Sequence, residues 1–348
     1  MLEAALTRHI KNIKSPQKGD MAMLTSEQFA VNCTNDTFCI FTENEMQAST
    51  VEQANAIGDL IHHSISDNTR IAYQTDLKHF TEWGGHLPAS PMTVAAYIAA
   101  FSEKQAVTTI TRRVATISKA HQAMGAENPC RSELVKATLQ GLRRKCGVTL
   151  KQAKALTRED LFIVLDGMGD SAKDARDRAL LLLGFAGAFR RSELVGLNVT
   201  DIETVRQGLI VTLRRSKTDQ EGAGRKIGIP HGRTRHCPVA ALTDWLTRSG
   251  ITEGAIFRPI TRHGQLQRER LSGDAVSEVI RERLAAVGID PAGYSGHSLR
   301  AGFATSAAQA GASTIKIRQQ TGHASDAMLS RYIRDGELFT ANAAGAVL

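Results

Sequence analysis

The spacing of hydrophobic residues in this chain is helical except in one segment, and this limits the folds that the chain can adopt. From about residue 51 apolar side chains recur at the three- and four-residue spacings of amphipathic helices. Between Gly208 and Pro230 the period becomes two, in the short β-branched runs LIVTL and RKIGI, and Gly222 and Gly224 supply turn positions between them. The sequence therefore predicts a mainly α-helical protein with a small antiparallel sheet.

Two groups of predicted helices are separated by residues 145–155, a stretch without an amphipathic stripe. A capping cluster at residues 66–69 opens the first group, and Thr157 with Asp160 forms a capping-box pattern that opens the second. The first group is predicted at residues 66–83, 91–104, 108–124 and 132–144. The second is predicted at residues 157–165, 177–189, near 192, 238–248, 275–287, 299–310, 314–320 and 326–332. We therefore expect a helical domain at 49–146 and a mixed α/β domain at 147–348, after an extension of unknown order at 1–48 with at most a short helix at 2–13.

The composition is ordinary for a globular protein, with 42% hydrophobic and 22% charged residues. The length of 348 residues fits about two domains. The longest near-apolar stretch, residues 179–189, falls short of the ~20 residues that cross a bilayer, and the N-terminus lacks the apolar core of a secretory signal. The five cysteines are far apart, which excludes a disulfide framework. We expect a cytoplasmic protein with reduced thiols and no membrane contact.

Positive charge is concentrated in one part of the chain. The net charge is +8, and residues 104–158 hold twelve Lys and Arg against two acidic residues. Such clustering is typical of proteins that bind polyanions, because each cation at a phosphate releases a condensed counterion. A solvated basic face would give the same pattern. The candidate DNA contacts are Arg112, Arg113, Lys119, Arg143, Arg144, Lys145, Arg214 and Arg215.

The sequence holds no Ser-His-Asp elbow, no carboxylate cluster for two magnesium ions and no HExxH or paired-cysteine zinc spacing. Metal-dependent nuclease chemistry is therefore disfavoured, and neither a metal nor a cofactor is expected. A dispersed set of cations and one tyrosine stands out instead: Arg190, Lys217, His297, Arg300, His323 and Tyr332.

This ordered set resembles the active-site pattern of the tyrosine recombinase, or phage integrase, family. That pattern is R-x-x-E-L, a lysine on a β-hairpin, H-x-x-R, G-H and a tyrosine nine residues later, and the chain fills it with Arg190-x-x-Glu193-Leu194, Lys217, His297-x-x-Arg300, Gly322-His323 and Tyr332. Residues 68–83 and 109–121 resemble the family's core-binding domain, so the likeness covers about residues 50–335. It implies a SAM-like helical domain and a catalytic domain that close on duplex DNA as a C-shaped clamp.

The residue types fit attack on a phosphodiester. Negative charge that gathers on the phosphate oxygens must meet fixed guanidinium groups where no metal neutralises it, a role that suits Arg190 and Arg300. A tyrosine has a pKa of ~10, so Tyr332 needs a neighbouring group to remove its proton, and His297 is the expected helper.

The other roles complete the reaction and agree with the resemblance. His323 is expected to donate a hydrogen bond to the phosphate, Lys217 to protonate the leaving 5′ oxygen as general acid, and Glu193 to orient the cations. A 3′-phosphotyrosyl bond keeps the ester linkage, so a 5′ hydroxyl from another strand can reverse the step without ATP or a metal. Strand exchange follows. The resemblance implies that four protomers join two double-stranded DNA sites and pass through a Holliday junction.

Two alternatives stay open. A type IB topoisomerase uses the same tyrosine chemistry to relax supercoils, and a non-catalytic DNA-binding regulator could share the scaffold. The recombinase-like N-terminal domain disfavours the first, and the complete residue set disfavours the second. The tail after Tyr332 could dock on a neighbouring protomer or fold back in cis, with equal support for each. The sequence does not indicate the DNA site, or whether the outcome is integration, excision or resolution of mobile DNA.

Overall fold

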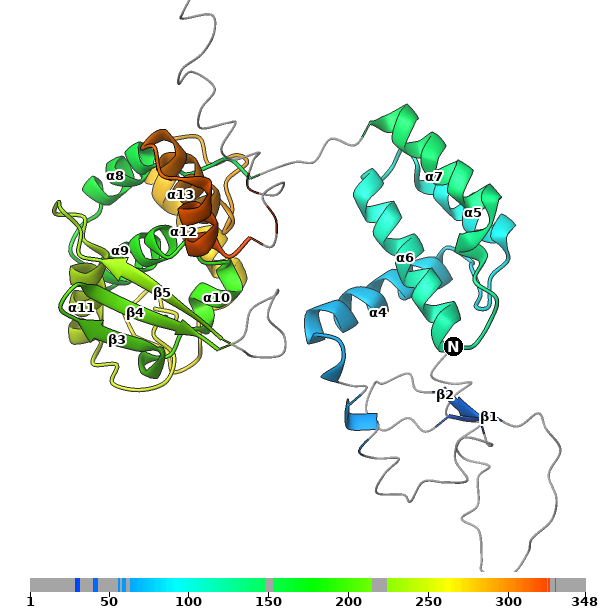
Figure 1. The fold of residues 1–348 in the computed structure, drawn as a ribbon, viewed down its shortest axis with the longest axis horizontal. Coiled ribbons are helices and arrows are strands. Elements are labelled where there is room, and N and C mark those ends of the chain that lie inside the picture. The colour runs from blue at the N-terminus through cyan, green and yellow to red at the C-terminus, as the bar shows by residue number, and fades with distance from the viewer. Residues whose placement is uncertain are drawn as a thin grey trace, which may run out of the picture. The chain divides into compact units, whose positions relative to one another are not determined.

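The computed structural model describes residues 63–147, 153–214 and 224–323, with residues 56, 58–60, 325 and 329 and the backbone of 29–31 and 40–42. The chain divides into two compact units, Met1–Leu150 and Lys151–Leu348 (Figure 1). The helix predicted at residues 2–13 lies outside the described residues, and so does the one at 326–332 apart from Leu329. No helix in the described ranges combines the length and the apolar character of a membrane span.

In the described part of the first unit, a few helical residues between 56 and 63 precede four longer α-helices and a short 3-10 turn. They are α4 (Asp67–Glu82), α5 (Pro91–Phe101), α6 (Val107–Ala123), η1 (Pro129–Arg131) and α7 (Glu133–Cys146). Two short strands precede them, β1 (Phe29–Val31) and β2 (Ile40–Thr42), paired antiparallel with Phe29 opposite Thr42. The sequence does not predict these two strands.

Side-chain caps explain where these helices begin. The hydroxyls of Ser66, Ser90 and Ser132 each accept the backbone N–H three residues further on, which satisfies one of the unpaired donors of a helix N-terminus. The apolar faces then pack around Phe80 and Tyr97, both 0% exposed, so the predicted helical domain has its own core.

The second unit combines several helices with a small antiparallel sheet. Its elements are α8 (Arg158–Asp166), α9 (Ala172–Ala186), α10 (Arg191–Gly196), η2 (Val199–Asp201), β3 (Ile202–Val205), β4 (Gly208–Leu213), β5 (Arg225–Pro230), α11 (Pro238–Ser249), α12 (Gly273–Ala286), α13 (Ser298–Gln309) and α14 (Thr314–Thr321). Helix α9 packs against α11 and α13, and its residues 179–184 are buried. The sheet lies beside these helices (Figure 1).

The sheet has one strand more than predicted. Strands β3, β4 and β5 run antiparallel in that order, with Leu213 opposite Arg225 at the end where residues 214–224 connect β4 to β5. Strand β3, with the sequence IETV, has only four residues and no fully buried side chain. Too little alternation was present for the sequence to indicate it.

Helix α9 also begins earlier than its predicted start at Asp177. Ser171 and Asp174 form a reciprocal capping box at its N-terminus. Asp177 is buried by its ion pairs with Arg176 and Arg283, at 2.6 Å each. Apolar spacing could not predict this first turn, because charged residues occupy its buried face.

The end of the predicted linker belongs to the second unit. The backbone N–H groups of Lys154 and Leu156 donate to the carbonyls of Gly293 and Ser298. Leu156 is 1% exposed in the core of that unit.

Candidate active site

Five of the predicted active-site residues lie in the described part of the second unit. They are Arg190, Glu193, His297, Arg300 and His323. Lys217 and Tyr332 lie outside the described residues, as does Arg215. Leu329, three residues before Tyr332, is fully buried in an apolar cluster with side chains of α13 and α14.

Arg190 is held by the carboxylate of Glu193. It is the N-cap residue of α10, and Glu193 accepts hydrogen bonds from its backbone N–H at 2.9 Å and from its Nη1 at 2.5 Å. The side chain of Glu193 is only 3% exposed. Because one carboxylate binds both the backbone and the guanidinium, Arg190 is fixed in direction. Its Nη2 reaches the carbonyl of Gly322 at 3.3 Å.

Arg300 is buried in α13, at 1% exposure, and joins the end of α9 to the end of α14. Its Nη1 donates to the carbonyls of Ala188, at 2.9 Å, and Thr321. Ala188 has a φ of +49°, a left-handed conformation that costs a non-glycine residue about 1–2 kcal/mol. That conformation lets the N–H of Phe189 reach back to the carbonyl of Gly184 and close the helix end. The strained turn therefore forms part of the site.

Three guanidinium groups bind the backbone at the C-terminal end of α14. Arg225 donates through Nη1 to the carbonyls of residues 319 and 320, at 3.2 Å each, Arg300 donates to that of 321 and Arg190 to that of 322. The last carbonyls of a helix have no partner within the helix and carry partial negative charge. Cations from α10, α13 and β5 thus meet at the turn that leads into His323.

His323 is buried and uncharged at neutral pH. Burial and the positive charges of Arg300 and Arg190 lower its pKa to about 3. Its Nδ1 lies 2.8 Å from Oγ1 of Thr321, whose hydroxyl donates to the carbonyl of Ile317. With that hydrogen already placed, Nδ1–H of the imidazole donates to the hydroxyl and Nε2 is an acceptor.

His297 lies at the N-cap position of α13, one residue before the helix that carries Arg300. Loss of hydration lowers its pKa below the ordinary value, and the charges of Arg300 and Arg190 lower it further. The preceding Gly296 donates its N–H to the buried Oγ of Ser277 on α12, at 2.9 Å. A neutral imidazole in this position can accept a proton at pH 7.

Arg225 belongs to this cluster, although it is not among the residues predicted from the sequence. Burial lowers its pKa, while Glu193 raises it and Arg190 lowers it, so both groups lie within electrostatic reach. Arg225 opens the predicted strand RKIGI, and nothing in that run distinguishes it from the other basic residues near the hairpin. Only the packing of β5 beside α14 identifies it.

Two predicted DNA contacts bind a buried acid. Asp76 of α4 is 1% exposed and lies 2.7 Å from Nη1 of Arg112 and 3.5 Å from Nε of Arg113. The side chain of Arg113 is 11% exposed and also donates to the ring of His79. These arginines tie α6 to α4. The DNA contact of Arg113 stays a prediction, and in the structure its side chain belongs to this network.

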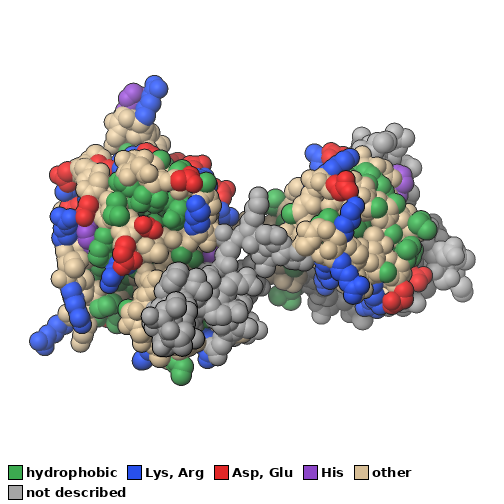
Figure 2. All heavy atoms as spheres, turned by 90° about the horizontal axis from the view of Figure 1, so that it is seen from above, with side chains coloured by type: hydrophobic (Ala, Val, Ile, Leu, Met, Phe, Trp, Pro, Cys, Tyr) green, Lys and Arg blue, Asp and Glu red, His purple; other side chains and the backbone are tan. Residues whose placement is uncertain are grey.

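The other described candidates are more accessible. Lys119, Arg143 and Arg144 are exposed, and exposed Lys145 pairs with Glu103 at 2.9 Å. Figure 2 shows Lys and Arg side chains gathered on one side of the N-terminal unit. In the second unit Arg214 is exposed and pairs with the buried Asp201 at 2.7 Å.

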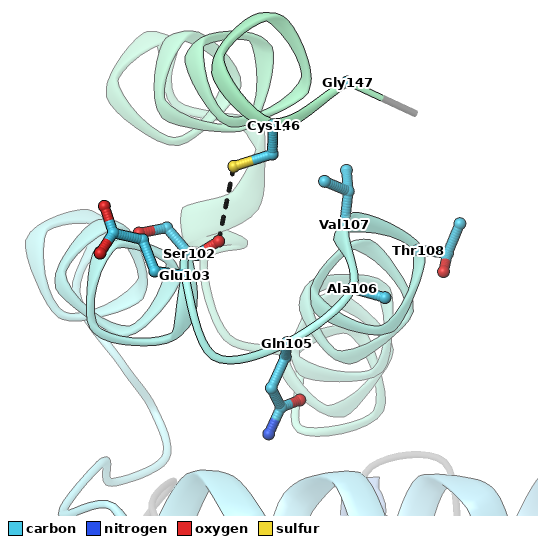
Figure 3. Close-up of a pocket in the computed structure, with 8 residues that line it drawn as sticks. All are labelled: Ser102, Glu103, Gln105, Ala106, Val107, Thr108, Cys146 and Gly147. Atoms are coloured by element: carbon cyan, nitrogen blue, oxygen red, sulfur yellow. Dashed lines mark hydrogen bonds between the residues drawn. The ribbon is translucent and has the colours of Figure 1, made fainter. Parts of the chain in front are cut away.

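A pocket in the first unit lies where the end of α5, the start of α6 and the end of α7 meet (Figure 3). The thiol of Cys146 donates to the carbonyl of Ser102 beside it, at 3.5 Å. No predicted catalytic residue belongs to this unit. Across the described parts of both units, no three His, Cys, Asp or Glu side chains are grouped as metal ligands.

Comparisons with known proteins agree on one family. The model described as "Phage integrase family" matches residues 154–337, and "Phage integrase, N-terminal SAM-like domain" matches residues 59–128. An integrase/recombinase XerD homolog of Selenomonas ruminantium is 39% identical over 81% of this chain and 86% of its own. The recombinase Cre of Escherichia phage P1 is 26% identical over 71% and 77%.

Solved structures share the fold. A lambda integrase dimer bound to a COC′ core site superimposes with a TM-score of 0.60 at 21% identity, covering 81% of this chain and 94% of that one. The XerH site-specific recombinase bound to a palindromic difH substrate also gives 0.60, at 16% identity, covering 86% and 85%.

Proposed function

Because the chain belongs to the phage integrase family, we propose that it is a site-specific DNA recombinase that cleaves and rejoins duplex DNA through a 3′-phosphotyrosyl intermediate. The observation that most supports this is the meeting of Arg190, Arg300 and two uncharged histidines around the end of α14. Such a cluster offers fixed cations to a phosphate and a neutral base to a nucleophile. The relatives' names and DNA complexes support DNA as the partner.

In this proposal Arg190 and Arg300 hold the scissile phosphate, and Tyr332 attacks the phosphorus. His297 takes the tyrosine proton, the P–O bond to the 5′ oxygen breaks, and Lys217 protonates that oxygen. The new ester to Tyr332 conserves the phosphodiester linkage, so a 5′ hydroxyl can reverse the step. The burial of Leu329 supports a route by which each chain supplies its own tyrosine.

His323 needs one change before it can donate to the phosphate. With Nδ1–H bound to Thr321, Nε2 accepts. A phosphate beside the ring raises the pKa of the imidazole and favours proton uptake, which gives Nε2 a hydrogen to donate. In this proposal, binding of the DNA phosphate itself makes Nε2 of His323 a hydrogen-bond donor.

For the whole assembly we propose two DNA sites and four protomers in the cytoplasm, with both units of each chain bound to the duplex. Helix α6 would enter the major groove, and the exposed cations at the end of α7 would contact the backbone. The segment after Tyr332 would dock in cis or on a neighbouring protomer. Holliday junctions in reactions with two sites would support this order of strand exchange.

A nicked duplex that traps the covalent intermediate tests the chemistry. We expect wild-type protein to form a covalent adduct with the 3′ end, and Tyr332→Phe to bind the DNA without forming it. Equal amounts of adduct from both proteins would refute the role of Tyr332. Relaxation of supercoiled DNA without a second site would favour topoisomerase activity instead.

The role of Lys217 is tested by changing the leaving group of the DNA substrate. Lys217→Ala should slow cleavage of ordinary DNA but cleave a substrate with sulfur at the 5′ bridging position at nearly the wild-type rate, because a thiolate leaves without a proton. A variant that stays slow on the sulfur substrate would remove Lys217 from the acid role.

A further inference from the structure

Arg225 sits at a junction between the hairpin and the active site. It is the first residue of β5 and lies opposite Leu213, the last residue of β4. The ten residues between Leu213 and Gly224 include Lys217. Arg225 therefore stands at the base of the connection that carries the proposed general acid.

The guanidinium of Arg225 lies against the turn that leads into His323. Its Nη1 donates to the carbonyls of Gln319 and Gln320 at 3.2 Å each. A Cβ on Gly322 would meet its Cζ at 2.6 Å, too close for any real contact. Gly322 also has a φ of +65°, a left-handed conformation that glycine adopts without strain. The missing side chain leaves the space that the guanidinium of Arg225 occupies.

The same turn is bound from two other elements. Arg190 reaches the carbonyl of Gly322 and Arg300 that of Thr321. Arg225 thus adds a contact from the sheet to those from α10 and α13. Arg225 donates hydrogen bonds to this turn, and its charge is close enough to lower the pKa of His323. We therefore expect a substitution of Arg225 to affect His323.

We propose that Arg225 is a positioning residue of the active site: it anchors the C-terminal turn of α14, and with it His323, to the base of the hairpin that carries Lys217. The proposal rests on the proposed recombinase function. It assigns Arg225 no contact with DNA or with the reacting atoms. Its effect on cleavage is transmitted through the position of His323.

The test measures single-turnover cleavage of the nicked duplex at saturating protein. We expect Arg225→Gln to slow adduct formation by about tenfold and DNA binding to stay within about twofold of wild type. In a His323→Ala background the same change should have no further effect, because the residue it positions is gone. Independent, multiplying losses would show that Arg225 does not act through His323 and would overturn the proposal.

Arg225→Lys separates geometry from charge. Lysine keeps the positive charge but not the planar fork that spans two carbonyls beside Gly322. We expect this variant to remain slow, whereas recovery of the wild-type rate would overturn positioning. If Arg225→Gln does not fold, Gly322→Ala provides a second route, since its methyl displaces the guanidinium. That variant should cleave slowly, and a wild-type rate would again overturn the proposal.

Arg206→Gln is the matched control. Arg206 is exposed in the turn between β3 and β4, at the opposite end of the same sheet. Its removal should leave cleavage unchanged. If wild-type protein forms no adduct at all, the proposed function fails and this inference with it. Normal cleavage by both wild type and Arg225→Gln overturns this inference alone.

Discussion

The hydrogen bond between Thr321 and His323 fixes which nitrogen of the imidazole carries the proton. Thr321 is 0% exposed, and its hydroxyl is held by the carbonyl of Ile317 one helical turn earlier. This hydrogen bond holds the imidazole in the orientation seen in the structure. Motif spacing predicted His323, but not its partner, because Thr321 matches no motif and acts only through the closed helix end.

Thr321→Val should slow adduct formation on the nicked duplex by about tenfold, the equivalent of ~1.4 kcal/mol of lost orientation. Valine has nearly the same shape but offers no oxygen to Nδ1. Thr321→Ser restores the hydroxyl and should cleave at close to the wild-type rate. Wild-type cleavage by the valine variant would show that the bond does not orient His323.

Acid should destabilise the second unit through His323. The folded protein keeps this pKa at about 3, whereas an unfolded histidine has a pKa of ~6.5. The unfolded state therefore binds more protons between these values, and stability falls as the pH drops through this window. Between pH 7 and pH 5 wild-type protein should lose about 2 kcal/mol more than His323→Gln.

Denaturant unfolding of the second unit at both pH values measures this difference. Carboxylates that titrate in the same range are common to both proteins and cancel in the comparison. Equal losses for the two proteins would show that His323 is not held neutral in the folded state.

The N-termini of helices were the features best predicted from the sequence. Ser66 and Thr157 are N-caps as expected, because a hydroxyl next to an apolar run has a local physical role that requires no knowledge of the fold. Strand β3 was missed for the opposite reason, because it is defined by its pairing with β4. The first turn of α9 was missed although Ser171 and Asp174 form a local capping box, because charged residues and not an apolar run follow that cap.

Two Gly→Ala substitutions should have opposite effects on stability. A methyl group on Gly302 of α13 would collide with the backbone carbonyl of Leu156. Because the clash is with backbone atoms, no side-chain rotation can relieve it. Gly302→Ala should therefore destabilise the second unit by about 3 kcal/mol. Gly141, inside α7, has nothing within 4 Å of a Cβ, so Gly141→Ala should stabilise the first unit by about 1 kcal/mol.

Thermal unfolding of the two variants measures these shifts. Stabilisation by Gly302→Ala would mean that the segment before α8 does not pack on α13 as described. A destabilising Gly141→Ala would place an unseen neighbour on that face of α7.

Across the whole chain, the site joins segments more than 130 residues apart, as in the contact from Arg190 to Gly322. The ordered motif selected Arg190, His297, Arg300 and His323, which the described part of the chain holds in the second unit, because attack on a phosphate requires those residue types; Lys217 and Tyr332 lie outside the described residues. The motif could not predict Arg225 or Ala188, whose parts depend on a packed helix end and a left-handed turn. Charge alone likewise gave Arg112 and Arg113 the same prediction, although the side chain of Arg112 is 47% exposed and that of Arg113 only 11%.

Binding of DNA by the first unit should depend on salt through the end of α7. Arg143 and Arg144 are exposed there, whereas Lys136, earlier in the helix, pairs with Glu133 at 2.8 Å. Each phosphate contact contributes about 0.9 to the slope of log K against log salt. Replacing both arginines by glutamine should therefore make the slope shallower by about 2 and weaken binding equally on specific and random duplexes.

Lys136→Gln, which removes one paired charge from the same helix, should leave the slope unchanged. At DNA and protein concentrations that saturate binding, the double variant should form the covalent adduct at the wild-type rate, since its missing charges hold the backbone and not the scissile phosphate. A wild-type slope for the double variant would show that Arg143 and Arg144 do not contact DNA phosphates. A slow reaction at saturation would mean that the end of α7 also helps to assemble the active site.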